Sequence, residues 1–433
     1  MIFYVNNKTK ICFVCGKNKK KQTNLPSLTI FCTFADRIQD YGVMTKYPIG
    51  LQNFQGLRED GYVYVDKTAF VYELAQSGKY YFLSRPRRFG KSLFLSTLEA
   101  YYQGKKELFK GLALEQLEKD WKVYPVLHLD LNAAKYTDSE ALESILDGHF
   151  RYFEETYGTT PNGLSLSERF KVIIRRAYEQ TGQKVVILVD EYDKPLLQAI
   201  GNKALQDEYR AMLKSVYGVA KTMDGYIQMA FFTGVTKLSV DSLFGDLNNI
   251  TNISLDKHFT ELCGFTEEEI RNNFDNEVGL MAKKNLLTKE KCYAILKENY
   301  DGYHFNEDSS GMYNPFCLIE VLNAMKFKDF GPDTDTKKYI VETLRQNNYK
   351  LENLIQENEA DLFLFDTELF GDSILASLYQ IGYLTIKDYD QKFNGFRLGI
   401  PNAEVKRGLL SVANSIKSAS TSPLLHVGLR VGK

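Results

Sequence analysis

A glycine, a lysine and a serine follow one another where the chain could bind phosphate. Gly90, Lys91 and Ser92 close the loop of "FLSRPRRFGKSLFL" and open a stretch with helical spacing of apolar residues. The free N–H groups of a helix N-terminus bind anions, a lysine there reaches the β- and γ-phosphates, and a serine hydroxyl binds Mg²⁺. The apolar strand "KYYFLS" precedes the loop, which is the required order. The alternative makes Lys91 a solvated residue at a helix start.

The loop departs from the usual phosphate-binding pattern G-x-x-x-x-G-K-[ST] at its first glycine, where Arg85 stands. Pro86 favours an extended backbone at the residue before it, so we expect this loop to leave its strand differently. One of Arg85, Arg87 and Arg88 could add positive charge near the phosphates. Equally, each of them could pair with acids or lie in solvent.

Two acids end the buried apolar strand "VVILVDEYD" further along the chain. In this arrangement Asp190 holds Mg²⁺ through its water shell, and Glu191 orients the attacking water. Thr233 ends the strand "YIQMAFFTGV", where it either senses the γ-phosphate or water, or simply closes the strand as a turn residue. Asp130, at the end of "VYPVLHLDL", has the same two interpretations, because the carboxyl ends of parallel strands line the ligand crevice of α/β sheets.

Strands and helices alternate along the part of the chain that holds these motifs. Short apolar runs at 79–84, 123–131, 184–190 and 226–235 are separated by amphipathic segments. This order predicts an α/β fold, a P-loop NTPase whose parallel sheet is flanked by helices on both faces.

Residues 1–43 precede this pattern as an extension without periodic apolar surface, and Met44 is a natural start. We therefore divide the chain into the extension, a P-loop domain, a helical lid region, a winged-helix-like region in which a helix is followed by two strands, and a divergent tail. The predicted ranges are 1–43, 44–255, 256–345, 346–410 and 411–433.

Composition narrows the classes of function. The chain has 433 residues and a net charge of −1, which argues against a uniformly basic coat for nucleic acid but allows a local basic face. No apolar run approaches the roughly 18 residues that span a bilayer, so we expect no membrane insertion. Six scattered cysteines favour the reducing cytoplasm over a disulfide framework. Cys12-x-x-Cys15 lacks the second ligand pair of a zinc site.

Several segments together resemble the bacterial AAA-ATPase-like family, whose members commonly carry a C-terminal PD-(D/E)XK nuclease-like domain. The resemblance spans residues 44–410 and rests on "YPIGLQNF", "GYVYVDKT", "YFLSRPRRFGKSLFLSTLEAYY", "LVDEYDKPL", "FFTGVTKLS", "YDGYHF" and "YNPF". In that family R-P-R-R-F-G-K-S is the phosphate-binding loop itself, so the resemblance implies that Arg85 belongs to the pattern.

The resemblance and the motifs together predict a site for ATP and Mg²⁺. The expected nucleotide contacts are Arg85, Pro86, Arg87, Arg88, Phe89, Gly90, Lys91, Ser92 and Leu93. The expected catalytic residues are Lys91, Glu191 and Thr233, and the expected metal ligands are Ser92 and Asp190.

The nuclease-like domain is where the chain departs from the family. Glu404-Val405-Lys406 matches the E-x-K pattern by its letters, but it follows a Pro-Asn break and has no evident partner acid. A nuclease needs an acid and an acid-x-lysine pair around one metal. We therefore expect this domain to be absent, as in a truncated or frame-shifted reading.

The function expected from these observations is a Mg²⁺-dependent ATPase that couples hydrolysis to conformational change. Two alternatives stay open: a scaffold that binds nucleotide without hydrolysing it, and a nucleic-acid-binding module that is a truncated form of an ATPase–nuclease. Glu191 favours hydrolysis, while the lack of an assignable arginine finger leaves room for the scaffold. The expected partners are nucleotide and, through the C-terminal region, nucleic acid or protein; homo-oligomerisation is also open.

Overall fold

The computed structural model describes residues 46–132, 135–236, 243, 250–331, 334–346, 363–365 and 373–421. Contacts divide the chain into Met1–Thr45 and Lys46–Lys433, and the description below concerns the second unit. The predicted extension 1–43, with Cys12 and Cys15, lies outside the described residues. Within the described ranges, no helix has both the length and the apolar character needed to cross a bilayer.

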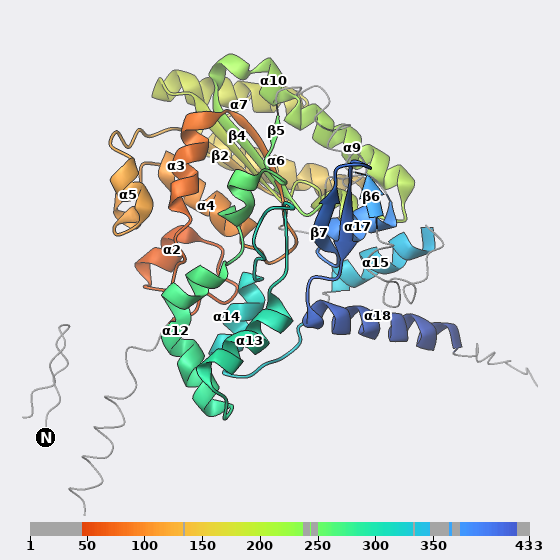
Figure 1. Ribbon diagram of the computed structural model, residues 1–433. Coiled ribbons are helices and arrows are strands. Elements are labelled where there is room, and N and C mark those ends of the chain that lie inside the picture. Colours follow the sequence, from red (N-terminus) through yellow and green to blue (C-terminus); the bar gives the residue numbers. More distant parts are fainter. Residues whose placement is uncertain are drawn as a thin grey trace, which may run out of the picture. The chain divides into compact units, whose positions relative to one another are not determined.

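A parallel sheet forms the centre of the P-loop domain (Figure 1). Among the described residues it has five strands in the order β2-β3-β4-β1-β5, and every neighbouring pair is parallel. In register, Ser84 lies opposite Gly234, and Asp130 lies opposite Asp190. The carboxyl ends of neighbouring strands therefore meet at one edge. The strands are β1 (Tyr80–Ser84), β2 (Val126–Asp130), β3 (Val185–Asp190), β4 (Ile227–Gly234) and β5 (Thr251–Asn252).

Helices pack on both faces of the sheet because successive side chains of each strand point to opposite sides. Leu83 and Leu188 pack with α3 and α4, whereas Phe82 and Ile187 pack with α6, α7 and α9. The predicted α/β class with a parallel sheet flanked by helices is confirmed. The helices of this domain are α2 (Phe54–Glu59), α3 (Thr68–Ser77), α4 (Lys91–Tyr102), η1 (Lys106–Phe109), α5 (Ala113–Leu117), α6 (Ser139–Tyr157), α7 (Leu166–Thr181), α8 (Lys194–Gln198), α9 (Lys203–Tyr217), α10 (Val219–Thr222) and η2 (Asp224–Tyr226).

Helices with a core of their own follow β5. Phe274, Leu296 and Leu318 lie in this second core, and a capping box of Thr266 and Glu269 starts its first long helix. Glu269 also forms an ion pair of 2.5 Å with Lys67 of the sheet domain. The elements are η3 (Lys257–Leu262), α12 (Glu267–Lys284), α13 (Lys289–Tyr300) and α14 (Pro315–Ala324).

The C-terminal part combines helices with a small antiparallel sheet. A helix followed by two strands was predicted there, and α17 (Ile374–Gln380) does precede β7 (Thr385–Asp390) and β8 (Gly395–Gly399). The sequence analysis missed β6 (Phe363–Phe365), which pairs with β8 and gives the order β6-β8-β7. Much of 346–372 lies outside the described residues, so the winged-helix interpretation stays a prediction. The flanking helices are α15 (Thr334–Gln346) and α18 (Ala403–Thr421).

Candidate functional site

The loop from β1 to α4 has the backbone geometry of a tight turn into a helix. The N–H of Arg85 donates to the carbonyl of Gly234 at 3.2 Å, so the strand ladder continues one residue past β1. Gly90 precedes α4 with φ 98°, a left-handed conformation that glycine adopts at little cost. Arg88 also has a positive φ of 67°. The extended ladder at Arg85 explains why this loop does not need the usual first glycine.

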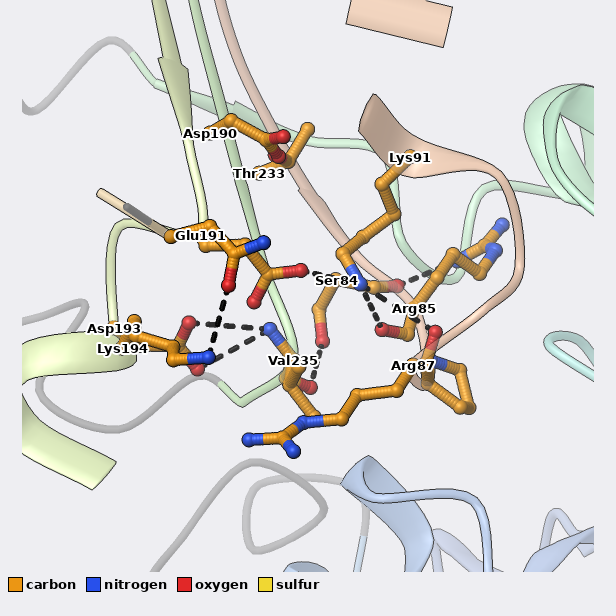
Figure 2. A network of polar contacts seen from close by, with 12 residues as sticks. Ser84, Arg85, Arg87, Lys91, Asp190, Glu191, Asp193, Lys194, Thr233 and Val235 are labelled. Atoms are coloured by element: carbon orange, nitrogen blue, oxygen red, sulfur yellow. Dashed lines mark hydrogen bonds and ion pairs between the residues drawn. The ribbon is translucent and has the colours of Figure 1, made fainter. Parts of the chain in front are cut away.

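Lys91 is enclosed by the loop that precedes it. Its side chain is 3 % exposed, and Nζ donates to the carbonyl oxygens of Arg85 at 3.1 Å and Pro86 at 3.4 Å. Nζ also lies 3.2 Å from Oε1 of Glu191. The interpretation of Lys91 as a solvated residue is therefore wrong. Figure 2 shows the ammonium group between the loop carbonyls and Glu191.

The buried side chains of Asp190 and Thr233 and the half-buried side chain of Ser92 form a polar group beside Lys91. The Thr233 hydroxyl donates to Oδ1 of Asp190 at 2.6 Å, and the Ser92 side chain is also hydrogen-bonded to this carboxylate. Asp190 is 3 % exposed, and burial, followed by the charge of Glu191, raises the pKa of its carboxyl. Hydroxyl and carboxylate oxygens are the ligand type that Mg²⁺ takes, so the side chains present fit this ion.

Glu191 occupies a strained position directly after β3. Its φ is 53°, a left-handed conformation that costs a non-glycine residue of order 1–3 kcal/mol. The N–H of Tyr192, the next residue, donates to the carbonyl of Thr233 in β4 at 2.9 Å. Such strain persists where the surrounding structure holds it, and here it directs the carboxylate to Lys91.

A cavity of about 210 Å³ opens beside these groups. The loop and α4 contribute a continuous stretch from Arg88 to Phe94, and Glu191 also lines it. The remaining wall is mainly apolar and comes from residues 48–52 and 63–65 and from the helical part, including Phe265 and Phe316. Arg88 stacks over the Phe316 ring at 4.3 Å.

Six of the nine predicted nucleotide contacts line this cavity, and three do not. The six are Arg88, Phe89, Gly90, Lys91, Ser92 and Leu93. Arg85, Pro86 and Arg87 lie in the same loop but outside the lining, as do Asp190 and Thr233.

Arg85 differs most from its predicted role. Its guanidinium is 1 % exposed and donates to the carbonyls of Ser84 at 2.9 Å, Ser254 at 2.7 Å and Phe259 at 3.1 Å. It also lies 4.0 Å above the Phe305 ring, and burial lowers its pKa to about 10. Within the part of the chain that the structure describes, the side chain neither lines the cavity nor pairs with an acid, and it does not lie in solvent. It links the loop to the segment after β5, a role that no sequence pattern indicated.

Asp193 is a polar residue of this edge that the sequence analysis did not assign. It is fully buried, and Oδ2 accepts from the N–H and the hydroxyl of Thr236 at 2.6 and 2.7 Å. The carboxylate also accepts from the N–H of Val235 and so fastens the turn after β3 to the turn after β4. Burial raises its pKa to about 6. Its position as the last acid of "VDEYD" was the available signal.

Two remaining acids accept hydrogen bonds from backbone N–H groups. Asp130 is exposed at the end of β2 and accepts from the N–H of Asn132 at 2.8 Å, as a turn residue does. Glu404, near the start of α18, accepts from the N–H groups of Phe330 and Gly331, both at 3.0 Å.

Comparison with known proteins identifies the family of the chain. The family model described as "Predicted AAA-ATPase" matches residues 48–244. An "Uncharacterized protein in vnfD 5'region" of Azotobacter chroococcum mcd 1 is 35% identical over 369 residues, which cover 84% of this chain and 69% of that protein.

Two solved structures from Aeropyrum pernix also match at low identity. The ORC2 protein in ADPNP–ADP complexes is 12% identical with a TM-score of 0.28, covering 85% of this chain and 94% of that chain. The ORC1 protein in complex with DNA is 10% identical with a TM-score of 0.26, covering 85% and 92%. From the family match and the Azotobacter relative, which carries 35% identity over most of both chains, the chain belongs to the AAA-ATPase-like family.

Proposed function

We propose that the chain binds ATP with Mg²⁺ at this edge of the sheet and hydrolyses it. The observation that carries the proposal is the convergence of Lys91, Ser92, Asp190 and Glu191 beside a mainly apolar cavity. An ammonium group, a hydroxyl and two carboxylates are the groups that phosphoryl transfer from ATP requires, since positioning and charge neutralisation supply most of the catalysis.

The loop would hold the phosphates on the N–H groups at the start of α4, where the helix dipole favours negative charge. Lys91 would exchange its hydrogen bonds to the Arg85 and Pro86 carbonyls for bonds to phosphate oxygens. Ser92 and Asp190 would hold Mg²⁺, which neutralises charge on the phosphates when it is bound. The adenine would lie in the apolar part of the cavity, between Val65 and Phe316.

Glu191 would orient the attacking water. Its carboxylate is an ion-pair partner of Lys91. When Lys91 turns to phosphate, that carboxylate becomes available to accept a proton from water. Thr233, which donates to Asp190, would keep the second carboxylate oriented.

Contacts of the loop support coupling between nucleotide state and the C-terminal parts. The carbonyl of Phe89 accepts from the N–H of Gly264 at 3.1 Å, and its ring packs edge-on against Tyr303 at 4.9 Å. A Cβ at Gly382, after α17, would lie 2.8 Å from Pro86. A change in loop conformation on nucleotide binding would therefore alter contacts with the helical part, at Gly264 and Tyr303, and with the C-terminal part, at Gly382.

Phosphate release under steady-state conditions tests hydrolysis. The parent chain should release phosphate from ATP in Mg²⁺, whereas Glu191→Gln should bind ATP and release phosphate at least about a hundredfold more slowly, the usual effect of losing a general base. Equal release by both proteins at the background rate would favour the non-hydrolysing scaffold, because ATP binding alone does not need Glu191.

A further inference from the structure

A second cavity, of about 420 Å³, is lined by four basic side chains. Arg87 comes from the phosphate loop, Lys194 from the start of α8, Lys135 from the segment before α6 and Lys338 from α15. Among the described residues that line it, none is acidic. Lys135 and Lys338 are exposed at its rim, while Arg87 and Lys194 are half-buried.

The floor of this cavity is apolar and partly aromatic. Leu197, Val235 and Tyr339 are each less than a tenth exposed and pack together, with Ile381 against them. Tyr136, which is buried, adds a second phenol ring to the lining. A basic rim over an aromatic and apolar floor is the arrangement that binds a phosphate on one side and a flat base on the other.

This cavity is built from the same segments as the ATP site but is separate from it. Arg87 precedes Lys91 in the loop, Lys194 follows Glu191, and Val235 follows Thr233, yet neither Lys91 nor Glu191 lines it. Figure 2 shows the Arg87 side chain running toward Val235, while the Arg85 guanidinium points the opposite way. Arg87, the second of the loop's three arginines, thus lies at the second cavity.

We propose that the second cavity binds a phosphorylated nucleoside, distinct from the ATP in the first site. Its phosphate would lie among the four basic groups, and its base would lie on the floor formed by Leu197, Val235 and Tyr339. The volume falls within the roughly 300–1,000 Å³ of ligand pockets. The same chemistry is offered by a free nucleotide and by one residue of a single-stranded nucleic acid.

The test uses two probes that lack adenine, dTMP and a fluorescein-labelled short oligothymidylate, with binding followed by calorimetry and by anisotropy. The variant is the double change Lys135→Glu and Lys338→Glu. The control is Lys184→Glu with Lys291→Glu, which alters net charge equally at two other exposed lysines. Lys184 precedes β3, so it lies at the opposite edge of the sheet from the site.

We expect at least one probe to bind the parent chain, and the rim variant to weaken that binding about tenfold or more while the control does not. For the oligothymidylate, the slope of log K against log salt should fall by up to about 0.7, the contribution of the one phosphate held among the basic groups. Binding of dTMP would show that a free nucleotide is a sufficient ligand. Binding of the oligothymidylate but not of dTMP would show that the ligand is a single strand.

ATP affinity separates this proposal from the proposed ATPase function. Both double variants should keep the parent's ATP affinity, and Lys91→Ala should lose ATP while retaining the probe. If the glutamate pair unfolds the chain, the milder pair Lys135→Gln and Lys338→Gln replaces it. The proposal is overturned if neither probe binds, or if the rim and control variants weaken binding equally.

Discussion

Lys91, the first residue of α4, forms an ion pair with Glu191, which directly follows β3. A lysine ammonium that is 3 % exposed would be costly without partners, and here two carbonyls and a carboxylate satisfy it. Each of these partners attracts the lysine ammonium group less strongly than the phosphates of a nucleotide would, because the phosphates carry more charge. The pair therefore keeps the site ready for an anionic ligand.

Replacing Lys91 by alanine should lower ATP affinity by roughly 3 kcal/mol, about a hundredfold, because a charged hydrogen-bond donor to phosphate is lost. Equilibrium titration with ATP and Mg²⁺ measures the change. The control is Lys106→Ala, an exposed lysine of η1, which should bind as the parent does. Parent-like affinity in Lys91→Ala would remove the phosphate-binding role from this loop.

Asp190 and Asp130 allow a matched comparison, because they lie opposite each other in register at the same edge. Asp190→Ala should abolish the dependence of ATP binding on Mg²⁺, since Asp190 and Ser92 are the proposed ligands. Asp130→Ala should leave that dependence unchanged, because its carboxylate only caps a turn. ATP titrations in Mg²⁺ and in EDTA measure both, and an equal response of the two variants would contradict the assignment.

At the scale of elements, one arginine joins the phosphate loop to the chain beyond β5. Arg85 donates to carbonyls in two further segments and stacks on Phe305, so the loop cannot move without disturbing these contacts. A lysine cannot replace it, because the planar guanidinium reaches several carbonyls in a fixed geometry.

Arg85→Lys should therefore lower the free energy of unfolding by about 3 kcal/mol, since buried carbonyls lose their donors. Arg58→Lys is the control, because Arg58 also donates to two carbonyls, those of Leu108 and Lys110, but at a half-buried site. The control should cost about 1 kcal/mol or less. Urea denaturation gives both values, and equal losses would show that burial of Arg85 adds nothing.

At the scale of the whole chain, contacts divide the protein into Met1–Thr45 and Lys46–Lys433, and the extension 1–43 stays a prediction from composition. The extension has little periodic apolar surface to bury, whereas residues 48–52 line the cavity in which we propose that ATP binds. We therefore expect residues 1–43 to be dispensable for stability and ATP binding, and residues 48–52 to be needed for ATP binding.

A chain that begins at Met44 should keep the melting temperature and ATP affinity of the full chain. A chain that begins at Asn53 should lose ATP affinity, because it lacks the stretch from Pro48 to Gln52 that closes the cavity. Thermal unfolding and ATP titration of the two truncations test this. A large loss of stability in the first truncation would mean that the extension packs on the rest of the chain.

The sequence by itself determined the parallel sheet, the order strand–loop–helix around Lys91 and the acids at the end of β3. These features depend on short-range patterns: apolar runs, a helix start and the residues next to them. Only the tertiary structure decided where the Arg85 side chain lies, that Asp193 is buried and that β6 joins the C-terminal sheet. In each case the partner lies far away in the chain, as Ser254 does for Arg85 and Thr236 for Asp193. The second cavity has the same origin, because Lys338 of α15 and Arg87 of the loop line it together although they lie far apart in the chain.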